Sequence, residues 1–274
     1  MKEHIIEVLK QIEKDYEVKI LFACESGSRA WGFPSKDSDF DVRFIYIQKV
    51  DWYLSIDPKR DVIEIPTRDS LSRPVHELLD VSGWELTKAL RLFRKSNPPL
   101  LEWMRSNIVY YKSYSTIEKM SQLASEVFVP ASGLYHYLNM AKGNFRDYLQ
   151  GQEVKVKKYF YVLRPILAAR WIEQFNTIPP IEFDILLDEL LPEGELKEQV
   201  RTLLIRKKAG EELDLEPKIE IINQFLNKEI ERIEKYAKIA KVHNADPTEQ
   251  LNRLFRETLN EVWRLPEKGT LSLL

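Results

Sequence analysis

The stretch "CESGSRAWGFPSKDSDFDVRFIYI", residues 24–47, places two unlike signals next to each other. A short turn of glycine and serine is followed by two aspartates, Asp39 and Asp41, at the start of an apolar run. Residues 40–47 are rich in strand-forming residues and alternate in polarity, so they are predicted to form a β-strand. Because alternate residues of a strand face the same side, both carboxylates point to one face of the sheet. Two unpaired carboxylates repel each other, so we expect a cation between them.

Composition limits the classes of protein to which the chain can belong. The chain has 274 residues, 44% hydrophobic and 31% charged, which suits a globular protein with one large domain or two modest ones. A net charge of −2 gives no general attraction for nucleic acid, so any such contact must be local. A single cysteine, Cys24, and four scattered histidines argue against a disulfide framework and a zinc site. Without a signal peptide or a long apolar segment, we expect a cytoplasmic protein with no membrane partner.

The first part of the chain is predicted to contain one helix followed by strands. The helix covers residues 1–16, where apolar residues recur on one side. Strands are predicted at 18–24, 40–47, 61–66, 75–81 and 107–112. Between the last two strands, Ser82 and Glu85 have the spacing of a capping box that begins a helix. Asn97, followed by proline, is expected to end that helix.

After residue 112, long amphipathic patterns replace the strand signals. Helices are predicted at 115–127, 132–150, 155–175, 182–191, 195–209, 217–241 and 247–264. The chain therefore divides into a sheet-containing domain, residues 1–112, and a helical domain, residues 113–274. The predicted fold class is α+β.

The Gly27-Ser28 turn and the aspartate pair complement each other chemically. Glycine lets the backbone approach an anion, and N–H groups of a turn that leads into a helix can hold phosphate oxygens. Two carboxylates suit Mg²⁺, which binds carboxylate and phosphate oxygens together. A phosphate-binding turn followed by a metal-binding pair therefore indicates phosphoryl or nucleotidyl transfer. Asp37, just before the pair, is interpreted as a turn residue.

This arrangement resembles the signature of the polymerase-β-like nucleotidyltransferase superfamily, which is Gly-Ser, a spacer and Asp-x-Asp. The matching residues are Gly27, Ser28, Asp39 and Asp41. The segments "DWYLSI", "GWELTKALRLFRKSNPPLLEWM" and "KKYFYVLRP" extend the similarity to roughly residues 22–171. Together they resemble an uncharacterised bacterial and phage group of nucleotidyltransferases whose members, associated with RNA ligases, are placed in RNA repair.

The resemblance implies a small mixed sheet backed by helices and a defined reaction. A hydroxyl group would attack the α-phosphorus of a nucleoside triphosphate and release pyrophosphate. Two Mg²⁺ ions, which Mn²⁺ could replace, would be held by the catalytic Asp39 and Asp41. Gly27 and Ser28 would hold the β- and γ-phosphates. The acceptor would be an RNA end, with a protein or small-molecule hydroxyl as the alternative.

The resemblance also implies a third catalytic and metal-binding carboxylate on a later strand. The candidates are Asp80, Glu77 and Glu64. Asp80 is favoured because it stands in the apolar setting "LLDVS" just before a predicted helix, where a charge requires a reason. The alternative interpretation of Asp80 is a capping or turn residue. Strand alternation would place Glu77 on the opposite face.

Further cations and aromatic residues are candidates for binding the nucleotide. Arg29 could contact a phosphate or pair with an acidic residue. Helical spacing places Lys157, Tyr161, Arg164 and Ala168 on one face, where Lys157 and Arg164 would complete the nucleotide site. The alternative for these basic residues is an ordinary solvated helix face.

Trp31 and Phe33, on either side of a glycine, could stack on a nucleobase or simply pack in the interior. Three functions fit the whole pattern. An active nucleotidyltransferase is favoured over a catalytically silent nucleotide-binding or antitoxin-like protein, because both sequence signals are intact. A glycosyltransferase with an Asp-x-Asp motif is disfavoured by the upstream Gly-Ser turn. The sequence leaves open the choice of triphosphate, the acceptor and the oligomeric state.

Overall fold

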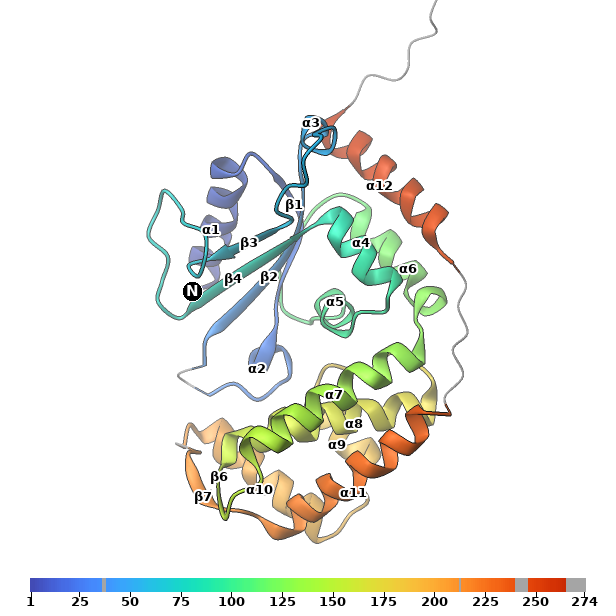
Figure 1. Ribbon diagram of the computed structural model, residues 1–274. Helices are drawn as coiled ribbons and strands as arrows, with labels where there is room; N and C mark the ends of the chain where they lie inside the picture. Colours follow the sequence, from blue (N-terminus) through green and yellow to red (C-terminus); the bar gives the residue numbers. More distant parts are fainter. Residues whose placement is uncertain (36–37, 212, 240–245, 265–274) are drawn as a thin grey trace, which may run out of the picture.

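The computed structural model describes residues 1–35, 38–211, 213–239 and 246–264. It shows a mixed sheet with helices on both faces, and a second part that is mostly helical (Figure 1). This architecture confirms the predicted α+β fold, with a small mixed sheet backed by helices. Asp37, the predicted turn residue, lies outside the described residues.

The larger sheet has five strands in the order β3-β4-β2-β1-β5. They are β1 (Lys19–Glu25), β2 (Phe40–Ile47), β3 (Val62–Ile65), β4 (Leu79–Glu85) and β5 (Val109–Lys112). β2 and β4 run parallel, whereas the other neighbours run antiparallel. Every predicted strand is present, although β4 begins and ends four residues later than predicted.

Both faces of the sheet are covered because its strands alternate. On one face, Val42 and Phe44 of β2 pack with α1 (Lys2–Asp15). On the other face, Ile45 and Ile47 belong to a second core cluster with four helices. These helices are α4 (Leu86–Arg94), α5 (Pro98–Met104), α6 (Thr116–Val127) and α12 (Thr248–Trp263). Asp41 shares this second face by alternation, at the end of β2 where the helices leave room.

The predicted capping box is wrong. Ser82 lies inside β4, where it is paired with β2, and α4 begins only after Glu85. Glu85 is itself the N-cap residue, and its buried carboxylate accepts a hydrogen bond from the backbone N–H of Thr87 at 2.7 Å. Gly83, within β4, has no room for a side chain, because an added Cβ would be 2.2 Å from the ring of Phe44.

Asn97 ends one helix and begins another. Its side-chain oxygen accepts a hydrogen bond from the backbone N–H of Leu100 at 3.2 Å, which caps α5 (Pro98–Met104). The sequence did not predict α5, because the proline that follows Asn97 was interpreted only as a stop. Proline is equally suited to the first position of a new helix. The omission matters because α5 carries Glu102 and Trp103.

The second part of the structure consists mainly of helices, as predicted. Its elements are α7 (Pro130–Tyr148), the 3₁₀ turn η1 (Val156–Tyr159), α8 (Phe160–Phe175), α9 (Phe183–Leu190), α10 (Glu195–Ala209) and α11 (Glu220–Ala237). A two-stranded ribbon of β6 (Glu153–Lys155) and β7 (Leu215–Pro217) was not predicted. The predicted helix 217–241 ends at Ala237, and residues 240–241 lie outside the described ranges. In the portion that is described, no helix is long and apolar enough to cross a membrane.

The two parts exchange elements across the predicted boundary. Helices α6 and α12 follow residue 112 in the chain but join the core cluster of the sheet (Figure 1). The indole N–H of Trp263, in α12, donates a hydrogen bond to the backbone carbonyl of Gln48 at 2.8 Å. Conversely, Phe33 from the loop after β1 is buried in the core of the helical part. The division into domains 1–112 and 113–274 stays a prediction. The structure shows that segments from each side of residue 112 pack in the core of the other part.

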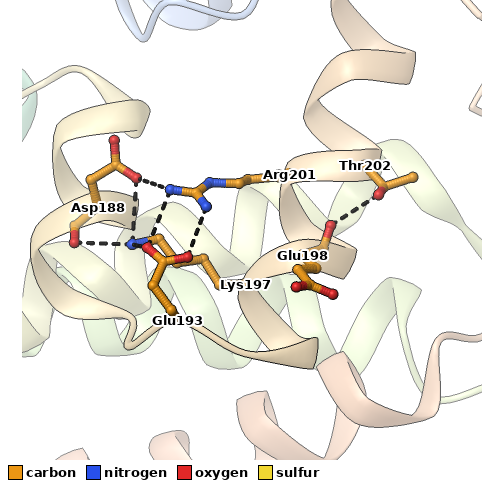
Figure 2. A network of polar contacts seen from close by, with 6 residues as sticks. All are labelled: Asp188, Glu193, Lys197, Glu198, Arg201 and Thr202. Carbon is orange, nitrogen blue, oxygen red and sulfur yellow. Dashed lines mark hydrogen bonds and ion pairs between the residues drawn. The ribbon is translucent and has the colours of Figure 1, made fainter.

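The helical part also carries a network of paired charges between α9 and α10 (Figure 2). Lys197 is only 3% exposed and forms ion pairs with Glu193 at 2.8 Å and with Asp188 at 3.5 Å. Arg201 binds the same two carboxylates at 2.9 and 2.8 Å. Each of these four charged side chains therefore has an opposite charge beside it.

Candidate active site

The sheet and the helical part enclose a cavity of about 610 Å³. Its walls come from the β1–α2 turn, β2, α5, α7, η1, α8 and α10, where α2 is the short helix Gly27–Ala30. Five of the predicted site residues line it: Gly27, Ser28, Asp39, Asp41 and Lys157. A cavity of this size is typical of small-molecule sites. The structure therefore brings the turn, the carboxylate pair and one predicted lysine into one place.

The two carboxylates of the pair have different surroundings. Asp39 is exposed, and among the described residues its carboxylate forms no hydrogen bond or ion pair. Asp41 is partly buried, and its Oδ1 lies 3.0 Å from Nη2 of Arg43. Burial raises the pKa of the Asp41 carboxyl, Arg43 opposes this, and the nearby charges of Asp80 and Asp39 raise it further. The ionised form of Asp41 is thus destabilised by its surroundings, which favours binding of a cation.

Arg43 is a site residue that sequence reasoning missed. It is two positions after Asp41 on the same face of β2, and its Nη2 contacts both Asp41 at 3.0 Å and Asp80 at 2.8 Å. The two aspartates are paired in register across the parallel strands β2 and β4. Its signal was present in the sequence "DFDVR", which continues the same-face spacing of Asp39 and Asp41 by one more position.

The predicted third carboxylate is close to the pair but already engaged. Asp80 does not line the cavity, and the cation between it and Asp41 is the guanidinium of Arg43. Glu77 is exposed in the turn before β4, so the predicted alternation does not apply to it, and Glu64 forms ion pairs with Arg60 and Arg68. In the described part of the chain, no three carboxylate, histidine or cysteine side chains gather to hold a metal ion.

The donor set fits a metal ion at the Asp39–Asp41 pair. The carboxylate oxygens are hard ligands that Mg²⁺ prefers, and such sites usually complete their coordination with water and substrate phosphates. Asp39 has both oxygens available among the described residues, and Asp41 has Oδ2. Asp80 as a metal ligand stays a prediction that would require Arg43 to move.

Gly27 lies directly against the carboxylate of Asp41. Its φ is +60°, and an added Cβ would be 2.1 Å from Oδ2 of Asp41. The strand and the turn are held together here, because the backbone N–H of Ser26 donates to the carbonyl of Asp41 at 2.8 Å. Only glycine satisfies both the backbone angle and the space. The turn therefore places the first N–H groups of α2, which have no partner within the helix, next to the carboxylate pair.

A buried glutamate, also missed, positions Asp41. Glu25 at the end of β1 is 0% exposed, and its Oε1 accepts a hydrogen bond from the backbone N–H of Asp41 at 2.8 Å. The hydroxyl of Tyr110 donates to its other oxygen. Burial raises the pKa of the Glu25 carboxyl, and these hydrogen bonds oppose that shift. The signal in the sequence was an acidic residue closing the apolar run "VKILFACE".

Arg29 does not line the cavity, and it pairs with no acidic side chain among the described residues. Its Nε donates to the carbonyl of Asp39 at 3.0 Å and its Nη2 to the carbonyl of Ser38 at 2.7 Å. Its guanidinium also lies 3.7 Å from the centre of the Phe40 ring. Arg29 thus fixes the backbone at the start of β2, and a direct contact with phosphate stays a prediction.

Lysines form another wall of the cavity. Lys157, Lys158 and Lys207 all line it. The Lys158 ammonium lies 4.3 Å from the ring centre of Tyr148 and 4.7 Å from that of Tyr161. Burial lowers the pKa of Lys158, and the neighbouring lysines lower it further. This concentration of positive charge in the same cavity as two carboxylates suits a ligand that carries phosphates and metal together.

Arg164 requires a correction. Lys157 is not part of the predicted helix face, because α8 begins at Phe160 and Lys157 lies in the 3₁₀ turn before it, whereas Tyr161, Arg164 and Ala168 keep their helical spacing within α8. Lys157 and Tyr161 line the cavity, whereas Arg164 and Ala168 are buried. The Arg164 side chain is 1% exposed, so it cannot contact a nucleotide in this structure as predicted.

Arg164 instead lies behind the cavity wall. Its Nη1 donates to Oε1 of Glu102 at 2.9 Å, and its Nε donates to the carbonyl of Ile181 at 3.2 Å. Its guanidinium lies 4.6 Å from the ring centre of Trp31. Nη2 has no hydrogen-bond partner within the described ranges. Trp31 lines the cavity, and Phe33 packs in the core against Phe160 and Phe183, as the packing interpretation predicted.

Similar proteins identify the family of this chain. Residues 1–257 match the family described as RlaP, the RNA repair pathway DNA polymerase beta family. The chain belongs to this family. It is also 59% identical over 264 residues to the uncharacterised protein YcgL of Bacillus subtilis (strain 168), which covers 96% of this chain and 98% of YcgL. A crystal structure of a nucleotidyltransferase-like protein from Exiguobacterium sibiricum 255-15 covers 95% of this chain and 91% of its own, with 11% identity and a TM-score of 0.29.

Within this RlaP-family cavity, the sequence motif accounts for one wall. Gly27, Ser28, Asp39 and Asp41 lie together, as the polymerase-β-like signature implies. Further lining residues are mostly aromatic or apolar, and we term this part of the lining the aromatic end of the cavity. These are Trp31, Pro99, Trp103, His136, Met140 and Tyr161, with Glu102 among them. No motif marked this end, because its residues come from separate helices.

Proposed function

We propose that this RlaP-family protein is a metal-dependent nucleotidyltransferase that moves a nucleoside monophosphate from a triphosphate to a hydroxyl group at an RNA end. The observation that carries the proposal is one shared cavity, in which Gly27 contacts the carboxylate of Asp41 while Asp39 and Lys157 line the walls. This combination provides anion-binding backbone, metal-binding oxygens and positive charge at one point. A purely structural role does not explain why these three features occur together.

Each group has a task in the proposed reaction. The N–H groups at Gly27 and Ser28 bind terminal phosphate oxygens, and Lys157 and Lys158 offset the negative charge of the triphosphate. Asp39 and Asp41 hold the metal, which when bound polarises the phosphoryl group and lowers the pKa of the attacking hydroxyl. Glu25 keeps Asp41 in place through its backbone N–H. Arg43 restrains the Asp41 carboxylate from the side facing Asp80.

An RNA end as acceptor is supported by the family description, which places RlaP in an RNA repair pathway. The net charge of −2 means that such an acceptor would be bound locally. Lysines in and beside the cavity, such as Lys157 and Lys207, provide a local contact of this kind.

The test is transfer of label from each of four α-³²P nucleoside triphosphates to a mixed RNA pool, with Mg²⁺ or Mn²⁺ and with chelator. We expect label on RNA only with metal, and none with Asp39→Asn. If the protein labels itself or a small molecule, the acceptor is different but the transferase remains. If triphosphate binds but no label moves to any acceptor, the silent nucleotide-binding alternative is correct.

A further inference from the structure

The aromatic end of the cavity contains one carboxylate that the proposed transfer reaction does not use. Glu102, on α5, lines the cavity with its side chain 15% exposed. Trp31, Trp103, His136 and Tyr161 line the cavity as well. Charged groups are rare in such surroundings unless they are paired, so the contacts of Glu102 indicate its purpose.

The hydrogen bonds of Glu102 leave acceptor capacity on one of its two carboxylate oxygens. Oε1 accepts from Nη1 of Arg164 at 2.9 Å and from the hydroxyl of Tyr137 at 2.7 Å. Among the described residues, Oε2 accepts only from the indole N–H of Trp31, at a long 3.3 Å. Because Arg164 and Tyr137 are buried, both acceptor sites of Oε1 are filled from behind the wall. The remaining acceptor capacity is on Oε2, beside Trp31.

Burying the Arg164 side chain behind the cavity wall is energetically unfavourable. Its guanidinium is 1% exposed, and Nη2 has no partner in the described part of the chain. A buried donor without an acceptor is destabilising, and an apolar residue of similar size would pack without that penalty. The arginine does, however, compensate the charge of Glu102 and fix its orientation. The pair therefore has the character of a preorganised recognition group, with one carboxylate oxygen left for a ligand.

His136 adds a second polar group to this end. It lines the cavity near Glu102, and burial lowers the pKa of its imidazole despite that neighbouring charge. A neutral imidazole presents one N–H donor and one acceptor nitrogen. An acceptor from Glu102 and a donor from His136 together match a base edge that carries an amino group beside a bare ring nitrogen. On their Watson–Crick edges adenine and cytosine have that pattern, whereas guanine and uracil present a carbonyl oxygen beside an N–H.

We propose that this end of the cavity binds the nucleobase of the triphosphate, with Glu102 accepting a hydrogen bond from the amino group of adenine while the ring lies among the aromatic side chains. The proposal rests on the nucleotidyltransferase function proposed above. It assigns Glu102 as the specificity-determining residue and Arg164 as its positioning residue. Adenine is favoured over cytosine because a purine covers more of the aromatic wall, which includes Trp31 and Trp103.

The experiment measures equilibrium binding, so that it does not depend on turnover. Intrinsic tryptophan fluorescence is titrated with α,β-methylene analogues of ATP, CTP, GTP and UTP in the presence of Mg²⁺. Two further ligands are purine riboside triphosphate, which lacks only the amino group, and inorganic tripolyphosphate. We expect the ATP analogue to bind most tightly, and removal of the amino group to weaken binding about tenfold or more, as for one hydrogen bond to a charged acceptor.

A variant then assigns that loss to Glu102. Glu102→Gln should bind ATP more weakly and should no longer distinguish ATP from purine riboside triphosphate. Because the substitution leaves Arg164 without its counter-charge, the variant is first checked by circular dichroism and thermal melting. If it does not fold, the ligand series on the unchanged protein still decides the question. Glu193→Gln, a surface position in the network of Figure 2, serves as the matched control and should keep the wild-type preference.

The outcomes separate this inference from the proposed function. Equal affinities for all four bases would overturn the base-binding assignment while leaving the transferase proposal standing. Tight binding of tripolyphosphate with no contribution from any base would do the same. Failure of every nucleotide and of tripolyphosphate to bind would contradict the proposed function itself. The same titration includes two short RNA oligonucleotides that end in adenosine or uridine; preference for the adenosine end, without preference among triphosphates, would assign the site to the acceptor and overturn the proposal.

Discussion

Two regions of this protein use the same charged residue types in opposite ways. In the network between α9 and α10, Lys197 and Arg201 each bind both Asp188 and Glu193, so each of these four side chains has two partners of opposite charge (Figure 2). In the cavity, Asp39 has no partner among the described residues. Paired charges of this kind are typical of a solvated surface, and unmatched ones of a binding site.

The energies of the two regions differ accordingly. The carboxylates of the network are well exposed, at 61% and 70%, so each ion pair contributes little to stability. In the cavity, burial raises the pKa of Asp41, and Asp39 and Asp80 add to the shift. Burial, and then the charges of neighbouring lysines, lower the pKa of Lys158. The cavity therefore holds unfavourable electrostatics that a metal–triphosphate complex would relieve.

The sharpest test of this contrast removes one carboxylate from each region. Because it removes one of the two carboxylates assigned to the metal, Asp39→Asn should lower nucleotide transfer by at least about 10³-fold, the scale of loss when one electrostatic contact to the reacting groups is removed. The melting temperature should stay the same, because no described residue depends on the Asp39 carboxylate. The rate is measured as label transferred from an α-³²P triphosphate.

Asp188→Asn is the matched control for that variant. It removes a carboxylate from two ion pairs, so it should lower the melting temperature slightly while nucleotide transfer continues at the wild-type rate. A transfer rate for Asp39→Asn close to that of Asp188→Asn would show that the cavity pair is not catalytic.

Two glycine variants test whether the close contact between Gly27 and Asp41 affects nucleotide transfer separately from backbone strain. Both Gly27 and Gly32 have positive φ, +60° and +87°, so alanine is strained at either position. Only at Gly27 would the new Cβ meet the Asp41 carboxylate, whereas at Gly32 nothing lies within 4 Å. Gly27→Ala should lower transfer about 100-fold by displacing the carboxylate, an effect typical of a misplaced catalytic group. Gly32→Ala should lower only the melting temperature, and equal activity losses in the two variants would contradict the contact.

The lysine wall provides the next smaller effect. Lys157→Glu should raise the Michaelis constant for the triphosphate roughly 10- to 50-fold, since a phosphate contact becomes a repulsion. Lys142→Glu makes the same charge change at a lysine that is paired with Glu234 and does not line the cavity. That control should leave the Michaelis constant unchanged. If both variants raise it equally, the effect is one of net charge and not of position, and it should then disappear at high salt.

The sequence predicted the parts of the site that lie on one continuous stretch. Gly27 and Asp41 were found because a turn and a strand spaced along the chain have a recognisable pattern. Arg43 was missed although alternation placed it on the same face, because a cation two positions after a carboxylate pair was not considered as a partner. Glu25 was missed because its function depends on burial, which the sequence does not state.

The other end of the cavity could not be predicted in the same way. Glu102 and His136 come from α5 and α7, which meet only in the folded chain. Arg164 was predicted as a cavity residue because it shares a helix face with Tyr161, but its side chain is buried behind the wall, against Glu102 and the carbonyl of Ile181. Helix existence and type were predicted well from periodicity, whereas the contact between helices depends on tertiary packing that periodicity does not contain.

The smallest expected effect comes from the other side of the comparison. Lys197→Met keeps the buried stem of the side chain and removes the ammonium that binds Glu193 and Asp188. Because both carboxylates are exposed and retain Arg201, neither is left as a buried unpaired charge. The free energy of unfolding should therefore change by no more than about 1 kcal/mol, and apolar replacements of partly buried ion pairs are often neutral.

Chemical denaturation of Lys197→Met, followed by circular dichroism, measures this change, and label transfer measures the activity of the same sample. Transfer at the wild-type rate is expected, because the network lies outside the cavity. A loss of several kcal/mol would mean that the buried ammonium is essential to the packing of α9 against α10. In that case the ion pairs of Lys197 would stabilise the protein more than the exposure of Asp188 and Glu193 indicates. Burial of the cation, and not the presence of a partner, would then separate structural charges from charges of the binding site.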